Sequence, residues 1–440
     1  MILNKSKDLY DRSLKVLAGP STFGKDIDKF AYGITPYSIS KAKGAYAWDV
    51  DGNKYIDTIM ALGAVTLGHC HPDVEAAVIH QLKKGSSLSL THKLEVEVAE
   101  MLCERIPCAE MVRFGKNGSD VTSAAVRLSR YISGEDHILF CGYHGWQDWY
   151  ISQTSMSGGI PEDIKKYSHR FNYNDVNSLV ELISKLNGKI ACIILEPTSF
   201  IEPNCEKICN NCSSNASCKG FLNQVREIAS KNNIILIFDE IVTGFRFDRG
   251  GYQNLADVTP DLACFSKAMG NGMPISALVG KKEYMNKSQE IFYSLTFGGE
   301  TASLAATKST LNVIDKENAP LVIAQNGSYL LDNLNKLIND YSLDKIISFR
   351  GYPCRNAMFV NDYDSTPSAD IRTYFIQECT KLKILTGGYH IVSLGHNRSV
   401  MDDLLGKYDL VLKLLKDSLF NKRLLDKLEC PTSKEGARTL

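Results

Sequence analysis

Apolar and polar residues alternate over residues 45–57, with the two-residue period of a β-strand. Tyr46, Trp48 and Val50 would share one face of that strand. The pair Asp51–Gly52 then follows, and it is favoured in tight two-residue turns. We therefore predict a β-hairpin in this stretch.

A helical period begins directly after the segment KNGSD, where apolar residues fall on one face at Val121, Ala125, Leu128 and Ile132. Further along, the unbroken apolar runs ACIILE (191–196) and NIILIFDE (233–240) are typical of central strands in a parallel sheet. A second helical face lies between them, at Leu222, Val225, Ile228 and Ala229. This order predicts a βαβ unit in an α/β fold, and LACF (262–265) would add a strand.

The last third of the chain contains a long amphipathic helix over residues 404–419, which indicates a smaller C-terminal domain. We expect residues 1–60 to pack with that domain. Residues 61–305 would form the large domain and residues 306–440 the small one. The polar tail after Arg423 is expected to be loose.

The composition excludes several classes of protein. The 440 residues include 50 basic and 50 acidic side chains, so no net field favours nucleic acid or an anionic membrane. No apolar stretch is long enough to span a bilayer, and the first residues lack the apolar block of a signal peptide. These observations predict a cytoplasmic protein without nucleic-acid or membrane partners.

Three polar side chains follow predicted strands. Glu196 ends ACIILE, Asp239 follows NIILIF, and Lys267 follows LACFS before the glycine-containing turn MGNG. In open α/β sheets, ligands bind beyond the carboxyl ends of the strands. We therefore expect these three groups at one ligand-binding edge.

The segment FGKNGSD (114–120) leads from a strand into a helix, so the amides of Gly118 and Ser119 would lie at a helix N-terminus. Free N–H groups and the helix dipole favour a phosphate there. The alternative is that Ser119 only caps the helix. Neither G-x-G-x-x-G nor G-x-x-x-x-G-K-[ST] occurs after a strand, which argues against a nicotinamide dehydrogenase or a nucleoside triphosphatase.

A lysine, a carboxylate and a phosphate site together match the needs of pyridoxal 5'-phosphate (PLP). Its aldehyde takes an amine, its ring nitrogen needs a carboxylate, and its phosphate needs an anion site. Lys267, Asp239 and Gly118–Ser119 would supply these groups. Tyr143 in CGYHGWQDWY (141–150) offers an aromatic face for the ring.

Several segments resemble, in family order, the class III (fold type I) PLP-dependent aminotransferases, in the subgroup of glutamate-1-semialdehyde aminomutase. They are WDVDGNKYID, LGHCHP, VRFGKNGSDVTSAAVRLSR, CGYHGW, IILEPT, LIFDEIVTGFR, DLACFSKAMGNGMPISALVG and LTFGGETASLAA, and they span residues 40 to 310. The resemblance implies a large domain with a mainly parallel seven-stranded sheet and a smaller α+β domain built from the C-terminal part and the N-terminal segment. It also implies a homodimer.

By matching position, the resemblance makes Lys267 the Schiff-base lysine and proton carrier, and Asp239 the partner of the ring nitrogen. Gly118 and Ser119 would hold the phosphate, and Val242 and Tyr143 would face the ring from either side. Thr296 would reach the phosphate in the neighbouring subunit's site. The implied reaction moves an amino group from an amino-acid donor to an aldehyde or ketone acceptor in two halves.

The chain departs from the family at places that bear on the substrate. The phosphate loop reads Asn-Gly-Ser-Asp where much of the family has Ser-Gly-Thr-Glu, and Glu300 stands where asparagine is usual. The second departure favours an aminotransferase over the alternative, an aminomutase. A non-catalytic relative that kept the fold is disfavoured because Lys267, Asp239 and Tyr143 are all present.

No late arginine in a matching context would bind an α-carboxylate; residues 386–399 contain His390, His396 and Arg398. The acceptor could therefore be an oxo-sugar, stacked on aromatic side chains near Trp146. Packing of the loop is the alternative role for Trp146, Trp149 and Tyr150. Trp146, Glu196 and His396 are the predicted substrate contacts.

Four of the 13 cysteines cluster as Cys205-x3-Cys209-x2-Cys212-x5-Cys218. Four thiols at this spacing fit a structural zinc or, as an alternative, an iron–sulfur cluster. An unligated cysteine loop is the other interpretation. Cys192 and Cys264 instead lie within apolar runs, where a thiol acts as a small hydrophobic group.

Overall fold

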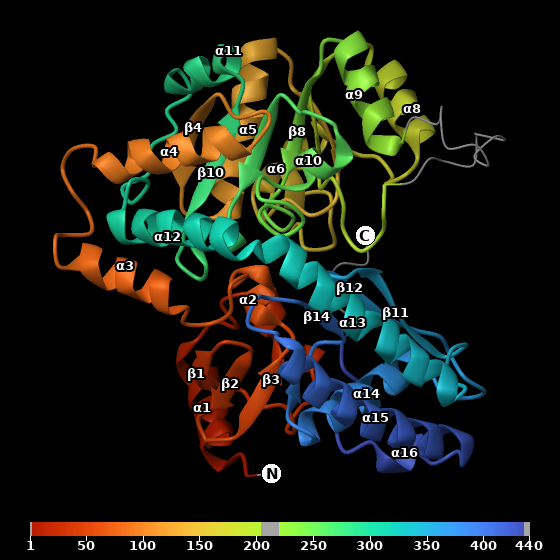
Figure 1. The fold of residues 1–440 in the computed structure, drawn as a ribbon. Helices are drawn as coiled ribbons and strands as arrows, with labels where there is room; N and C mark the ends of the chain where they lie inside the picture. The colour runs from red at the N-terminus through yellow and green to blue at the C-terminus, as the bar shows by residue number, and fades with distance from the viewer. Residues whose placement is uncertain (1, 204–219, 435–440) are drawn as a thin grey trace. The chain divides into compact units, whose positions relative to one another are not determined.

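The computed structural model describes residues 2–203 and 220–434 (Figure 1). The chain divides into two compact units. The large unit comprises Pro72–Pro320, and the small unit comprises Met1–His71 with Leu321–Leu440. The division predicted from the sequence, with boundaries after residues 60 and 305, stays a prediction.

A seven-stranded sheet in the order β4-β10-β9-β8-β7-β5-β6 forms the centre of the large unit. Its strands are β4 (Met111–Gly115), β5 (His137–Cys141), β6 (Ser168–Arg170), β7 (Ile190–Leu195), β8 (Ile235–Asp239), β9 (Leu262–Phe265) and β10 (Ser276–Gly280). Strand β10 is antiparallel to both its neighbours, β4 and β9, while the strands from β9 to β6 pair in parallel. The predicted α/β fold with a mainly parallel seven-stranded sheet is confirmed.

Every residue of β7, β8, β9 and β10 is buried. Since successive side chains of a strand point to opposite faces, both faces of the sheet must be covered. Helix α5 (Gly118–Ser133) covers one face, where Val121 and Leu128 pack with Cys264 and Leu278. The predicted helical period after KNGSD is therefore a core-facing stripe.

The large unit contains further helices besides α5 (Figure 1). They are α3 (Pro72–Leu82), α4 (Lys93–Arg105), α6 (Asp148–Ile151), α7 (Glu162–Lys165), α8 (Val176–Leu186), α9 (Phe221–Lys231), α10 (Tyr252–Ala256), η3 (Lys267–Gly270), α11 (Lys282–Met285), η4 (Asn286–Gln289) and α12 (Thr301–Glu317). Helices α8 and α9 contact each other, and α9 also contacts β8. The predicted βαβ unit is thus β7–α9–β8.

The small unit contains two short sheets, β1-β2-β3-β13 and β11-β12-β14. Its elements are α1 (Asn4–Val16), η1 (Phe23–Lys25), η2 (Ile27–Lys29), β1 (Ile39–Lys43), β2 (Tyr46–Asp49), β3 (Lys54–Asp57), α2 (Met60–Gly63), β11 (Ile347–Tyr352), β12 (Arg355–Val360), α14 (Ser368–Lys381), β13 (Ile384–Leu385), β14 (Tyr389–Ile391), α15 (Arg398–Phe420) and α16 (Leu424–Lys427). Helix α13 (Ala319–Asp340) begins at the end of the large unit and lies mainly in the small one.

The predicted hairpin is β2 and β3, which pair antiparallel. The carboxylate of Asp49 closes the turn, because its Oδ1 accepts from the backbone N–H of Asp51 at 3.0 Å and of Asn53 at 2.8 Å. Strand β3 also pairs in parallel with β13. The N-terminal segment and the C-terminal part therefore share one sheet.

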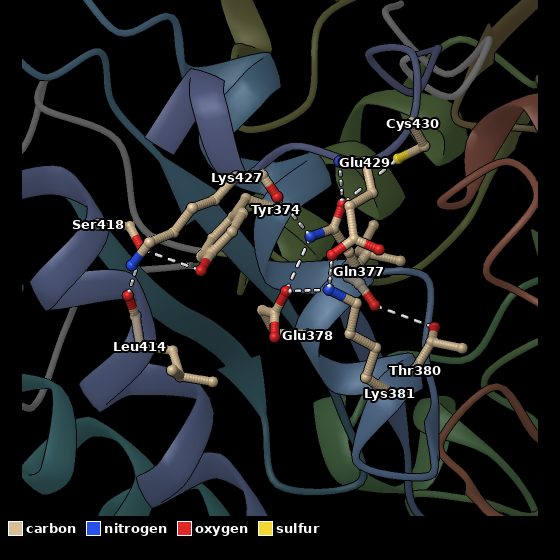
Figure 2. A network of polar contacts seen from close by, with 11 residues as sticks. Tyr374, Gln377, Glu378, Thr380, Lys381, Leu414, Ser418, Lys427, Glu429 and Cys430 are labelled. Atoms are coloured by element: carbon tan, nitrogen blue, oxygen red, sulfur yellow. Dashed lines mark hydrogen bonds and ion pairs between the residues drawn. The ribbon is translucent and has the colours of Figure 1, made fainter. Parts of the chain in front are cut away.

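The expectation of a loose tail after Arg423 is wrong for residues 424–434. Leu424 is buried, and the backbone N–H of Glu429 donates to Gln377 Oε1 at 2.8 Å. Figure 2 shows this contact within a polar network that joins α14 to the chain after α16. The tail is ordered because the buried amide of Gln377 binds backbone groups that a polar sequence does not reveal.

Among residues 2–203 and 220–434, no helix is both long and apolar enough to cross a bilayer.

Candidate active site

Three predicted site residues lie where neighbouring parallel strands end. Glu196 follows β7, Asp239 is the last residue of β8, and Lys267 follows β9 after Ser266. Because β7, β8 and β9 are adjacent and parallel, their carboxyl ends share one edge of the sheet. The structure therefore brings the predicted amine and both carboxylates to the same edge.

Lys267 begins the short helix η3 with a left-handed backbone, φ 43°. A residue with a side chain rarely adopts this conformation, so the neighbouring structure must hold it. Ser266 Oγ donates to Ile275 O at 2.7 Å, which ties the end of β9 to the residue before β10. The half-buried Lys267 is thereby fixed at the edge of the sheet.

Asp239 is paired with a histidine that the sequence analysis did not single out. His144 Nδ1 lies 2.8 Å from Asp239 Oδ2, and both side chains are buried. The backbone N–H of Ile241 donates to Asp239 Oδ1 at 3.1 Å. Burial raises the pKa of the Asp239 carboxyl above its usual value, although the hydrogen bond with His144 opposes this shift.

The other ring nitrogen of His144, Nε2, is also hydrogen-bonded. Nε2 is 3.1 Å from the carbonyl oxygen of Cys141, which can only accept, so Nε2 carries a hydrogen. Nδ1 lies 2.8 Å from Asp239 Oδ2, so the ring is also hydrogen-bonded to this carboxyl group. The two contacts hold the imidazole ring in place beside Asp239.

The loop after β5 folds back onto α5 and β7. Its Gly142 and Gly145 have φ values of +104° and +111°. A Cβ at Gly145 would lie 2.2 Å from Ser119 Oγ, so only glycine allows this approach. Thr122 Oγ1 donates to His144 O at 3.0 Å, and the N–H of Tyr143 donates to Glu196 Oε2 at 3.0 Å.

The predicted phosphate site is the N-terminus of the 16-residue helix α5. Asn117 occupies the N-cap position, and Gly118 and Ser119 are the first two helical residues. The alternative, in which Ser119 is the cap, is therefore wrong. Asp120 Oδ2 accepts from the N–H of Lys116 at 3.1 Å and of Asn117 at 2.7 Å, which fixes the entry to the helix.

These groups fit PLP. A helix N-terminus with Gly118 and Ser119 suits a phosphate dianion, and the close glycine Gly145 keeps that end of the helix clear of an extra side chain. A buried carboxylate suits a protonated ring nitrogen, and a half-buried lysine at the same edge suits the aldehyde. Asp239, Lys267 and the end of α5 could therefore hold the cofactor.

The remaining predicted contacts lie in different settings. Val242 is half-buried in the turn after β8, and 40% of Tyr143 is exposed. Thr296 is exposed in the segment before α12.

Trp146 is 70% exposed, but Trp149 and Tyr150 belong to the buried core. Stacking on a sugar acceptor is therefore wrong for Trp149 and Tyr150, and the alternative role, packing of the loop, applies to them.

His396 lies in the small unit and is buried there. Its Nδ1 lies 2.9 Å from Ser393 Oγ, and its Nε2 lies 3.1 Å from Asp57 O. Burial lowers the pKa of His396 to about 4. Both ring nitrogens are engaged, so contact with a substrate would require one of these bonds to break.

The cysteines Cys205, Cys209, Cys212 and Cys218 lie outside the described residues. Within the described ranges, no group of three or more His, Cys, Asp or Glu side chains could hold a metal ion. Cys192 and Cys264 are buried in β7 and β9, as predicted.

Comparison with known proteins decides the family. Residues 29–401 match the family model described as aminotransferase class-III. The chain belongs to the class III aminotransferase family. Glutamate-1-semialdehyde 2,1-aminomutase of Methanosphaera stadtmanae is 33% identical over an alignment of 438 residues that covers 94% of this chain and 100% of the relative. The 3-aminobutyryl-CoA aminotransferase of Cloacimonas acidaminovorans is 32% identical over 390 residues, which are 88% and 91% of the two chains.

The fold of this class III family member also matches solved structures. The FumI protein of Sphingopyxis sp. MTA144, described in its PLP internal aldimine form, superposes with a TM-score of 0.85. The match covers 98% of this chain and 99% of FumI at 24% sequence identity, so it shows the fold. The predicted fold type I architecture is thereby confirmed, and membership of the class III family supports PLP as the cofactor.

Proposed function

We propose that this class III family member is a PLP-dependent aminotransferase that moves an amino group from an amino-acid donor to an aldehyde or ketone acceptor. The observation that carries the proposal is the meeting of Lys267, the buried Asp239–His144 pair and the N-terminus of α5 at one edge of the sheet. These are the groups that PLP requires of a protein.

When bound, PLP supplies an aldehyde that takes up amines and a ring that accepts electrons from the neighbouring carbon. Lys267 would hold the cofactor through its Nζ. Once released, that Nζ would carry a proton to or from the substrate carbon, as a general acid and base. Asp239, hydrogen-bonded to His144, would keep the ring nitrogen protonated. The first turn of α5 would orient the phosphate.

An aminomutase is the second proposal, and one observation favours it specifically. The relative from Methanosphaera stadtmanae carries that activity in its name and aligns over its whole length. An aminomutase moves the amino group within one substrate and needs no external donor. The donor requirement therefore separates the two proposals.

The test uses purified protein loaded with PLP, with single amino acids added in the absence of an acceptor. An aminotransferase should lose its visible absorbance with the right donor, release the matching oxo acid in equal amount, and regain the absorbance when an acceptor is added. Turnover of glutamate-1-semialdehyde without any added amino acid would instead support the aminomutase. Protein that stays colourless with added PLP would contradict both proposals.

Three narrower proposals concern the acceptor, a metal at the cysteine cluster and the cellular location. We propose that an oxo-sugar acceptor would stack on Trp146, which is exposed, and not on Trp149, which is buried. A metal at Cys205, Cys209, Cys212 and Cys218 rests on their spacing, and elemental analysis tests it. The cytoplasmic location also stays a prediction.

We further propose that the chain forms a homodimer in which Thr296 completes the neighbouring subunit's phosphate site. Exposed apolar side chains flank Thr296: Phe292 is 86% exposed and Phe297 is 57% exposed. Large apolar side chains on one exposed segment are typical of a surface that another protein covers. The molecular mass in solution tests this assembly.

A further inference from the structure

An ion pair joins the phosphate loop to the start of α12. Lys116 Nζ lies 3.1 Å from Glu300 Oε2, and each side chain is only 15% exposed. Lys116 lies in the loop between β4 and α5, whereas Glu300 is the N-cap of α12. The contact therefore links two segments that lie 184 residues apart in the sequence.

On one side, Lys116 is firmly attached to the end of α5. Asp120 accepts hydrogen bonds from the backbone N–H of Lys116 and of Asn117 through the same oxygen, Oδ2. Gly118 and Ser119 follow immediately, as the first helical residues. A shift of Lys116 would therefore shift the groups that we assign to the phosphate.

On the other side, Glu300 is attached to α12. Its Oε1 accepts from the N–H of Ala302 at 2.6 Å, and its Oε2 accepts from Ser303 Oγ at 2.6 Å. Thr301, the first residue of the helix, donates its own N–H to Ser86 O at 2.8 Å. The carboxylate that binds Lys116 is thus held by several contacts of its own.

The pair is buried enough to fix a geometry. Exposed ion pairs contribute little because water and salt screen them, but that screening falls as burial increases. Burial raises the pKa of the Glu300 carboxyl, but hydrogen bonds from Ser303, the Ala302 N–H and Lys116 outweigh it and leave the pKa lowered. Glu300 is therefore charged at neutral pH. The asparagine that is usual at this position in the family could not form such an ion pair.

We propose that Lys116 and Glu300 are positioning residues, which hold the phosphate-binding end of α5 against the start of α12. This inference rests on the proposed function, since it assumes that the end of α5 binds the phosphate of PLP. A simpler alternative is that Lys116 attracts the phosphate only as a nearby positive charge. The two readings predict opposite effects of changing Glu300.

The experiment measures the dissociation constants of PLP and of pyridoxal, which lacks the phosphate, for full-length Lys116→Met and Glu300→Gln. If the pair positions the phosphate site, both substitutions weaken PLP binding about tenfold, the loss expected for a charge-assisted hydrogen bond. Pyridoxal binding should change by less than about twofold. Glutamine keeps an acceptor for the Ala302 N–H, so the cap of α12 is preserved.

Four results would overturn the inference. Tighter PLP binding by Glu300→Gln would show that only the charge of Lys116 matters. Equal losses of affinity for PLP and for pyridoxal would show a purely structural role. So would a lower melting temperature without any change in the ratio of the two dissociation constants. Failure of the wild-type protein to bind either compound would instead refute the proposed function itself, and this inference with it.

Controls come from the same chain. Lys308→Met removes another ion pair of α12, with Glu97 at 2.8 Å, and should leave the ratio of the two dissociation constants unchanged. Lys116→Arg keeps the charge and should restore most of the PLP affinity. The double variant Lys116→Met/Glu300→Gln should bind PLP about as weakly as either single variant, because both remove the same link.

Discussion

At the scale of single residues, the site depends on the hydrogen bond between His144 and Asp239. The carboxylate is buried, which on its own favours the neutral acid and would leave a cofactor nitrogen without an anionic partner. His144, 2.8 Å away, counters this by donating a hydrogen bond. Removing the histidine should therefore raise the pKa of Asp239 further.

This gives a pH prediction for His144→Leu. Asp239 must be ionised to pair with a cationic ring nitrogen, so PLP affinity falls as pH drops through the pKa of Asp239. Because the substitution raises that pKa, the fall should begin at a higher pH than in the wild type. Titration of PLP binding between about pH 5 and pH 8, a range above the usual pKa of a carboxyl group, measures the difference.

The matched control is His137→Leu, at the opposite end of β5. His137 Nδ1 contacts His169 Nε2 at 2.9 Å and lies at the amino end of the strand, away from Asp239. It should leave the pH dependence of PLP binding unchanged. An unshifted profile in folded His144→Leu would contradict the role assigned to this histidine.

Residue spacing predicted some of these positions but not others. Lys267 and Asp239 could be placed because an unbroken apolar strand fixes where the next polar residue emerges. His144 could not, since its contact arises from a loop that folds back through the positive φ values of Gly142 and Gly145. The segment CGYHGW carried the only signal, a histidine directly before a glycine.

At the scale of elements, the main sheet was predictable because β7, β8 and β9 are continuous apolar runs. In the small unit, alternation predicted the hairpin of β2 and β3, but the other short strands lack such a signal and were not predicted. The tail was predicted to be loose because its sequence is polar, yet Gln377 and Thr373 on α14 bind its backbone. Ser433 N–H donates to Thr373 Oγ1 at 2.9 Å.

The tail contacts predict that a chain ending at Arg423 unfolds more readily than the full chain. The shortened chain loses the burial of Leu424 and the hydrogen bonds of Glu429 and Ser433. Together these contacts contribute about 3 kcal/mol to the free energy of unfolding. A chain ending at Lys434 keeps these contacts and should match the full chain. Thermal unfolding compares the three, and equal melting temperatures would contradict a stabilising role for these contacts, of which Figure 2 shows the one between Glu429 and Gln377.

At the scale of the whole molecule, the family assignment explains why such distant segments carry the site. Residues from 116 to 300 include the proposed phosphate loop, His144, Asp239, Lys267 and Glu300, and the parallel sheet and α12 bring them into place. The sequence resemblance predicted the places of Lys267, Asp239 and the phosphate loop and the cofactor, but not the role of His144. It could not predict the link between Lys116 and Glu300, because these residues lie 184 positions apart and no pattern in the sequence marks them as partners.

The central claim is that Lys267 binds PLP covalently, and one measurement tests it directly. The PLP-loaded protein is reduced with borohydride, digested, and analysed by peptide mass spectrometry. We expect one phosphopyridoxyl group per chain, on the peptide that contains Lys267, and none in Lys267→Ala. A modification on another lysine, or no modification in protein saturated with PLP, would contradict the account.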